Sequence, residues 1–119
     1  MSTAIDHLEP RAVWKHFAAL SAIPRGSENE AAARAHVLAL ARRQGLEAVQ
    51  DEAGNVVVRK PARPGRENAA TVAIQGHLDM VCEKNEGTAH NFETDPIQLI
   101  VDGDWLKAGG TTLGADNGV

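Results

Sequence analysis

The chain has 119 residues and a mass of 12.6 kDa, enough for one ordinary domain, but its 43% hydrophobic residues include only two Trp, two Phe and no Tyr, which predicts a thin core. Twelve Lys and Arg against 16 Asp and Glu give a formal net charge of -4 without a basic stripe, which argues against nucleic-acid binding. Cys82 is the single cysteine, so the chain cannot form an intrachain disulfide. Charged residues between Met1 and Leu20 argue against a signal peptide, and the lack of a long apolar run argues against a membrane span. We therefore expect a soluble cytoplasmic protein.

Two helices are predicted in the first part of the chain. Pro10 suits a first helical turn, and apolar residues recur after it at helical spacing, at Val13, Trp14, Phe17 and Leu20. A second helix, about Glu28 to Gln44, is predicted because Ser27 and Glu30 have capping-box spacing before an alanine-rich stretch. Gly45 offers this helix a C-terminal stop.

Strand patterns follow the helices. Residues 46–50 and 55–59 predict one hairpin, and residues 98–101 and 105–106 predict a second across the turn signal Asp102-Gly103-Asp104. The apolar run Thr71–Ile74 is typical of a central strand that is covered on both faces. Together these elements predict an α/β fold, with a sheet flanked by helices in one domain over residues 1–119.

His77 and Asp79 are the first candidates for chemistry. They follow the run Thr71–Ile74, so they are expected at the carboxyl end of that strand, where open α/β sheets bind ligands. Two residues that are two apart in extended backbone point to the same side. One of the pair can then bind a metal ion while the other orients it, although the His-x-Asp spacing alone is also common in structural pairs.

Asp116 is the second candidate. It follows residues 109–114, which we expect to form a mobile, polar approach, and a turn or a helix N-cap would be the ordinary interpretation of Ala115-Asp116-Asn117-Gly118. A carboxylate can also bridge the two cations of a two-metal hydrolase. Asp116 and His77 are therefore the predicted metal ligands, and Asp79 is the predicted catalytic residue.

Long stretches of the chain resemble one enzyme family, the aminoacyl-histidine dipeptidases, which are also called Xaa-His or cytosolic non-specific dipeptidases and are part of the M20 metallopeptidase family. The resemblance covers nearly the whole chain, and its long local motifs are much less expected by chance than either short site pattern. They are residues 23–27, 51–56, 75–85, 90–92, 95–97, 102–106, 108 and 110–118.

The resemblance implies roles for the candidate residues. It implies that His77 ligates one zinc, that Asp116 bridges two zincs, and that Asp79 orients the His77 imidazole and tunes the site. It further implies a zinc-exopeptidase-like mixed sheet, small peptide substrates including Xaa-His dipeptides, hydrolysis by a metal-bound water, and a homodimeric parent enzyme. Other divalent cations could replace zinc.

The resemblance also implies that this chain is an N-terminal portion of the catalytic domain. The family's general-base glutamate, its remaining metal ligands and its inserted second domain all follow the Gly114–Gly118 motif. Three or more protein ligands usually hold a catalytic zinc, and a general base contributes roughly 10²- to 10⁴-fold to the rate. We therefore expect residues 1–119 alone to have no appreciable peptidase activity.

Other polar residues are given structural roles. Three histidines in or near the predicted helices, His7, His16 and His36, are expected to face solvent or to be partly buried. His90 is expected to stabilise the loop that follows the metal strand. Cys82 is expected to act as a small buried hydrophobe. Residues 109–114 lack both nucleotide-binding glycine patterns.

Two other functions remain open at this level. A related M20 tripeptidase or deacylase would use the same metal framework, although Met80–Asn85 and Asn117-Gly118 favour the dipeptidase. A non-catalytic remnant could instead pair with another chain through exposed strand edges.

Overall fold

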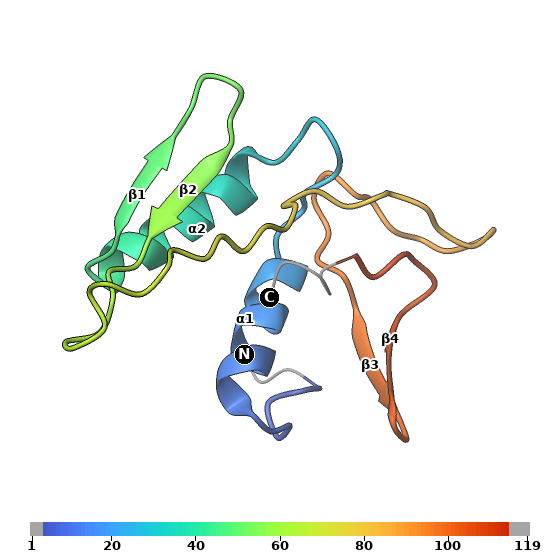
Figure 1. Ribbon diagram of the computed structural model, residues 1–119. Coiled ribbons are helices and arrows are strands. Elements are labelled where there is room, and N and C mark those ends of the chain that lie inside the picture. Colours follow the sequence, from blue (N-terminus) through green and yellow to red (C-terminus); the bar gives the residue numbers. More distant parts are fainter. Residues whose placement is uncertain (1–3, 115–119) are drawn as a thin grey trace. The chain divides into compact units, whose positions relative to one another are not determined.

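Two helices and four strands make up the regular structure of residues 4–114, the part of the chain described by this computed structural model (Figure 1). In chain order they are α1 (Arg11–Ser21), α2 (Ala31–Arg43), β1 (Glu47–Gln50), β2 (Val56–Arg59), β3 (Leu99–Asp102) and β4 (Trp105–Ala108). The described residues divide into two compact units. The first unit lies within Met1–Ala33 and Gly76–Val119, and the second unit is Arg34–Gln75.

The first unit is built around α1 and the β3–β4 hairpin. The core is centred on Ile5 and Phe17, which are 1% and 6% exposed. Seven partly buried apolar residues from α1, the hairpin and the flanking segments pack on them, namely Leu8, Trp14, Ala18, Leu99, Val101, Leu106 and Leu113. The first predicted helix and the second predicted hairpin are therefore confirmed, with Pro10 in extended conformation at the N-cap of α1.

The β3–β4 turn follows the predicted Asp-Gly signal. Asp102 pairs with Trp105, so Gly103 and Asp104 form a two-residue loop. Gly103 has φ 58°, and a positive φ at the first loop position is the requirement of a tight hairpin turn that glycine meets without steric cost.

The second unit contains most of α2 and the β1–β2 hairpin, both of which were predicted. The helix ends in a Schellman motif, in which Gly45 N donates to Arg42 O and Leu46 N donates to Ala41 O. Gly45 has φ 70°, as this motif demands. The β1–β2 register pairs Gln50 with Val56 across a loop that begins at Asp51.

The start of α2 differs from the prediction. The helix begins at Ala31 rather than near Glu28, because Glu28 has φ 70° and cannot be part of a right-handed helix. Glu28 N is instead bonded to Glu30 Oε1 at 2.7 Å.

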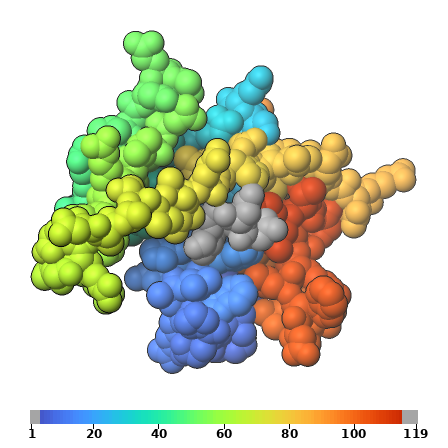
Figure 2. All heavy atoms as spheres, viewed as in Figure 1, coloured from blue at the N-terminus to red at the C-terminus, as the bar shows by residue number. Residues whose placement is uncertain are grey.

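The predicted central strand at Thr71–Ile74 is absent from the described structure, and that prediction is wrong. Val72 and Ile74 are 80% and 96% exposed, and the yellow residues around them lie at the surface in Figure 2. An apolar run becomes a central strand only when neighbouring strands pair with it on both sides, and no described segment pairs with residues 71–74. The described strands form two separate two-stranded antiparallel sheets.

One smaller expectation is also corrected. Cys82 is exposed rather than buried, although its thiol still donates to Met80 O. Among residues 4–114, no helix combines the length and the apolar character that crossing a bilayer requires.

Candidate functional site

The backbone around Asp79 is held by a short parallel contact. Gly26 and Met80 form an isolated β-bridge, in which Met80 N donates to Arg25 O at 3.0 Å. Met80 is only 3% exposed and anchors this segment in the first unit. Since Ser27 follows Gly26 and Asp79 precedes Met80, the bridge brings these two polar side chains together.

His77 and Asp79 contact each other, as their spacing predicted. Nδ1 of His77 lies 3.0 Å from Asp79 Oδ1 and 2.9 Å from the Asp79 carbonyl oxygen. A carbonyl oxygen can only accept, so Nδ1 must carry the proton. In the neutral imidazole, the lone pair then belongs to Nε2.

The exposure of this pair suits ligand binding. The His77 side chain is 57% exposed and that of Asp79 is 34% exposed. No described residue hydrogen-bonds Nε2 of His77. This is the arrangement in which a carboxylate orients an imidazole whose other nitrogen can ligate a metal ion.

Ser27 completes the cluster from the opposite side of the carboxylate. Its hydroxyl donates to Asp79 Oδ2 at 2.6 Å. This hydrogen bond and the weaker one to His77 hold the pKa of Asp79 below its ordinary value of 3.8. Asp79 is therefore an anion at neutral pH, with both oxygens engaged.

The segment that leads toward Asp116 runs beside the segment that follows Asp79. Lys84 and Thr111 form an antiparallel bridge, and Thr112 N donates to Glu83 O at 2.9 Å. The Thr112 hydroxyl donates to Val81 O at 2.6 Å. These bonds join residues 111–114, which are half-buried, to the segment that follows Asp79, and the mobility expected of residues 109–114 stays a prediction.

Arg25 ties the same segment to α1. The residue is 2% exposed, and its Nη1 donates to Gly114 O at 3.0 Å while its Nε donates to Leu20 O at 3.2 Å. Gly114 has φ 67°, and a Cβ at this position would lie 2.6 Å from Met80 Cβ. The two motif segments thus pack closely at Met80 and Gly114.

Asp116, the second predicted metal ligand, lies outside the described residues. Within residues 4–114, no group of three His, Cys, Asp or Glu side chains could hold a metal ion. The described part of the site is therefore one oriented imidazole and its carboxylate. The metal roles of His77 and Asp116 and the catalytic role of Asp79 stay predictions.

His90 has the contacts of a loop-stabilising residue. Its ring packs edge-on against Phe92, with centroids 4.5 Å apart, and its carbonyl oxygen accepts a bond from Lys84 Nζ at 2.7 Å. Asp95 closes the loop by accepting from Asn91 N and from the Thr94 hydroxyl. These contacts agree with the structural role expected for His90.

Sequence reasoning missed Ser27 and Arg25 as site residues. Ser27 was assigned to a helix cap, but its hydroxyl bonds to Asp79 instead. Their shared signal in the sequence is the motif Ile23–Ser27, which also resembles the dipeptidases.

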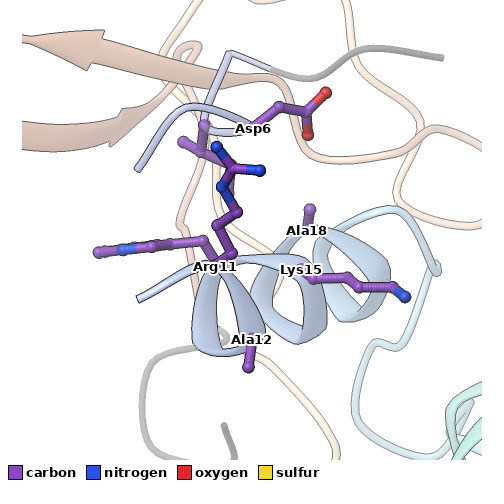
Figure 3. Close-up of a pocket in the computed structure, with 7 residues that line it drawn as sticks. Asp6, Arg11, Ala12, Lys15 and Ala18 are labelled. Atoms are coloured by element: carbon purple, nitrogen blue, oxygen red, sulfur yellow. The ribbon is translucent and has the colours of Figure 1, made fainter. Parts of the chain in front are cut away.

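A cavity of about 410 Å³ lies elsewhere in the first unit, on one face of α1 (Figure 3). Its lining combines apolar and charged side chains, namely Ile5, Asp6, Arg11, Ala12, Trp14, Lys15 and Ala18. The Lys15 side chain extends away from Asp6 and Arg11 in Figure 3. Among the described residues, the lining of the cavity shares no member with the His77, Asp79 and Ser27 group and includes no histidine.

Comparison with known proteins supports the resemblance inferred from the motifs. No family model matches the chain. The chain is 44% identical over 115 residues to the cytosol non-specific dipeptidase of Escherichia coli (strain K12), and this match covers 97% of the chain. The crystal structure of aminoacylhistidine dipeptidase from Vibrio alginolyticus is 46% identical and superposes on 98% of the chain with a TM-score of 0.92.

The resemblance and the α/β fold class are thereby confirmed. The chain spans 24% of the length of each of these two proteins.

Proposed function

Because this chain corresponds in sequence and fold to about a quarter of an aminoacyl-histidine dipeptidase, we propose that it supplies His77, Asp79 and Asp116 to the metal centre of a zinc-dependent dipeptidase. The proposed reaction is hydrolysis of dipeptides, including those with a C-terminal histidine. The observation that carries the proposal is the contact between His77 Nδ1 and Asp79, which leaves Nε2 as the nitrogen with the free lone pair.

The chemistry of the described donors fits zinc. A neutral imidazole is a common zinc ligand, and metal-bound imidazoles usually donate their other N–H to a carboxylate or carbonyl group. His77 donates to both kinds of acceptor on Asp79. Bound zinc would lower the pKa of a coordinated water and polarise the peptide carbonyl.

Each residue has a distinct part in this proposal. His77 would bind the zinc ion through Nε2, and Asp79 would fix the tautomer and the ring orientation. The Asp79 carboxylate also makes the imidazole a stronger base, because its negative charge stabilises positive charge on the ring. Asp116 offers two oxygens that can bridge a pair of cations.

The chain of residues 1–119 by itself is proposed to be inactive. One imidazole and one bridging carboxylate hold zinc weakly, whereas a catalytic site usually has three protein ligands. Dipeptide hydrolysis by the purified chain, or tight binding of two zinc ions per chain, would contradict this part of the proposal. Isothermal titration with zinc and a ninhydrin assay of dipeptide cleavage measure the two quantities.

The cellular setting is part of the proposal. We infer a cytoplasmic enzyme that acts on small peptides as a homodimer. The Escherichia coli relative is named a cytosol dipeptidase, which supports the location. The formal net charge of this chain is -4 and the chain has no basic stripe, so its sequence does not support nucleic acid as a partner.

The test uses the full-length product of the natural reading frame that contains this chain. Cleavage of a panel of dipeptides is measured before chelation, after chelation and after zinc is restored. We expect activity that disappears with the chelator, returns with zinc and is lost in His77→Ala, while His36→Ala in α2 leaves it unchanged. Chelator-resistant cleavage, or preferred cleavage of tripeptides or acylated amino acids, would contradict the proposed function.

A further inference from the structure

We propose that Ser27 is a positioning residue for the His77–Asp79 pair, an inference that rests on the proposed function of that pair. The Ser27 hydroxyl holds Asp79 Oδ2, so that Oδ1 remains on His77 Nδ1 and the imidazole keeps Nε2 available for a ligand. Ser27 itself does not touch the reacting atoms.

The geometry supports a strong contact. The oxygen-to-oxygen distance of 2.6 Å lies in the range of charge-assisted bonds between a hydroxyl and a carboxylate. Without this bond, one oxygen of Asp79 would lose its fixed partner. The carboxylate could then rotate about its Cβ–Cγ bond and release Nδ1.

The local backbone gives an independent argument. Gly26 O accepts from Asn29 N at 2.8 Å, which closes a four-residue turn with Ser27 and Glu28 at its centre. Glu28 has φ 70°, a conformation that disfavours residues other than glycine and is required at the third position of a type II turn. Strained residues of this kind persist only where the surrounding structure over-determines them, and they cluster at functional sites.

The strained turn separates Ser27 from the helix that its sequence pattern suggests. Ser27 would cap a helix that began at Glu28, but α2 begins at Ala31. Its hydroxyl is bonded to Asp79 instead. The Ser27 hydroxyl therefore holds the Asp79 carboxylate rather than capping α2.

The chain offers a matched pair of substitutions and a control. Ser27→Ala removes the hydroxyl, and Ser27→Thr keeps a hydroxyl at the same exposed position. Ser21→Ala is the control, since Ser21 Oγ is buried and has no hydrogen-bond partner within the described residues. The two changes to Ala remove only a hydroxyl group, and Ser27→Thr adds one methyl group at an exposed position.

The experiment measures zinc affinity of the full-length product by competition with a chromophoric chelator, together with the visible spectrum after cobalt(II) replaces zinc. We expect Ser27→Ala to weaken zinc binding by up to about 10-fold and to alter the cobalt spectrum, a smaller effect than loss of a direct partner of the ligand, because Ser27 acts on His77 only through Asp79. Ser27→Thr should restore both readouts, and Ser21→Ala should match the wild type.

The outcomes separate this inference from the proposed function. If the wild type binds zinc and cleaves dipeptides while Ser27→Ala has the same affinity and spectrum, the role of Ser27 is overturned and the proposed function stands. A Ser27→Thr variant that behaves like Ser27→Ala also overturns it, since the hydroxyl would not be the cause. A wild type that binds no zinc overturns both.

Discussion

Asp79 accepts two side-chain hydrogen bonds, one on each carboxylate oxygen. His77 Nδ1 donates to Oδ1 at 3.0 Å, and the Ser27 hydroxyl donates to Oδ2 at 2.6 Å. This pairing explains why one side chain both orients the imidazole and stays ionised. We expect the charge of Asp79, rather than its shape, to be the property that the site requires.

The variant Asp79→Asn tests that statement. It keeps the size of the side chain and removes its charge, so we expect zinc affinity of the full-length product to fall about 10- to 100-fold. Asp102→Asn is the control, because Asp102 pairs with Lys107 on the β3–β4 hairpin. Equal zinc affinity of the two variants, measured by chelator competition, would show that the charge of Asp79 has no special role.

Gly114 gives a second prediction at the scale of single residues. Ala at this position would need φ 67° and would put its Cβ 2.6 Å from Met80 Cβ, whereas Ala at Gly103 would need φ 58° with no atom within 4 Å. Both changes should cost about 1 kcal/mol of unfolding free energy for the backbone conformation, and Gly114→Ala about 1–3 kcal/mol more for the overlap.

Urea unfolding followed by tryptophan fluorescence measures this difference. Trp14 and Trp105, the two tryptophans of the chain, both lie in the first unit, so the signal reports the unit that contains Gly103 and Gly114. Equal unfolding free energies for the two variants would contradict this prediction, because they would mean that Met80 can move away from the added methyl group with no loss of stability.

The β1–β2 loop is a self-contained element. Asp51 Oδ1 accepts from Asn55 N and Asp51 Oδ2 accepts from Asn55 Nδ2, both at 2.8 Å. The Asn55 side chain is the main reason that the pKa of Asp51 is held below 3.8, and the Asn55 backbone N–H adds to it. Because the folded pKa is lowered, these bonds stabilise the hairpin above about pH 4 and are lost as the pH falls through the folded pKa.

Asn55→Ala should raise the pKa of Asp51 toward its ordinary value, because it removes the largest cause of the shift. Carbon-13 NMR titration of the Asp51 carboxyl group measures the change. Asn68→Ala, at an exposed position in the loop that follows β2, is the control and should leave the Asp51 titration unchanged. An Asp51 titration that is the same in all three proteins would show that Asn55 does not hold the carboxylate.

The elements that could be predicted from the sequence are those with local causes. The helix stop at Gly45 and the turn at Gly103 each depend on glycine at a positive φ, and both were found as predicted. The run Thr71–Ile74 depends on strand partners that its own residues do not specify, so its apolar pattern gave a wrong prediction. The prediction for Ser27 was wrong for a related reason. Its side chain could cap the following helix or bond to Asp79, and only the fold brings the Asp79 carboxylate within reach.

At the scale of the whole molecule, the candidate site is assembled from distant parts of the sequence. The segments at Gly26, Met80 and Gly114 meet in the first unit through the Gly26–Met80 bridge and the bond from Arg25 to Gly114 O. The pairing of His77 with Asp79 was predictable from their spacing. The bonds from Arg25 to Leu20 O and Gly114 O were not, because backbone carbonyls carry no sequence signal.

The central claim is that His77 presents Nε2 to a zinc ion while Asp79 holds Nδ1. Anomalous X-ray diffraction at the zinc absorption edge, from crystals of the zinc-loaded full-length product, tests it most directly. The account predicts an anomalous peak about 2.0–2.1 Å from His77 Nε2, with Nδ1 still bonded to Asp79. Zinc bound to Nδ1, or an anomalous map with no peak at His77, would contradict it.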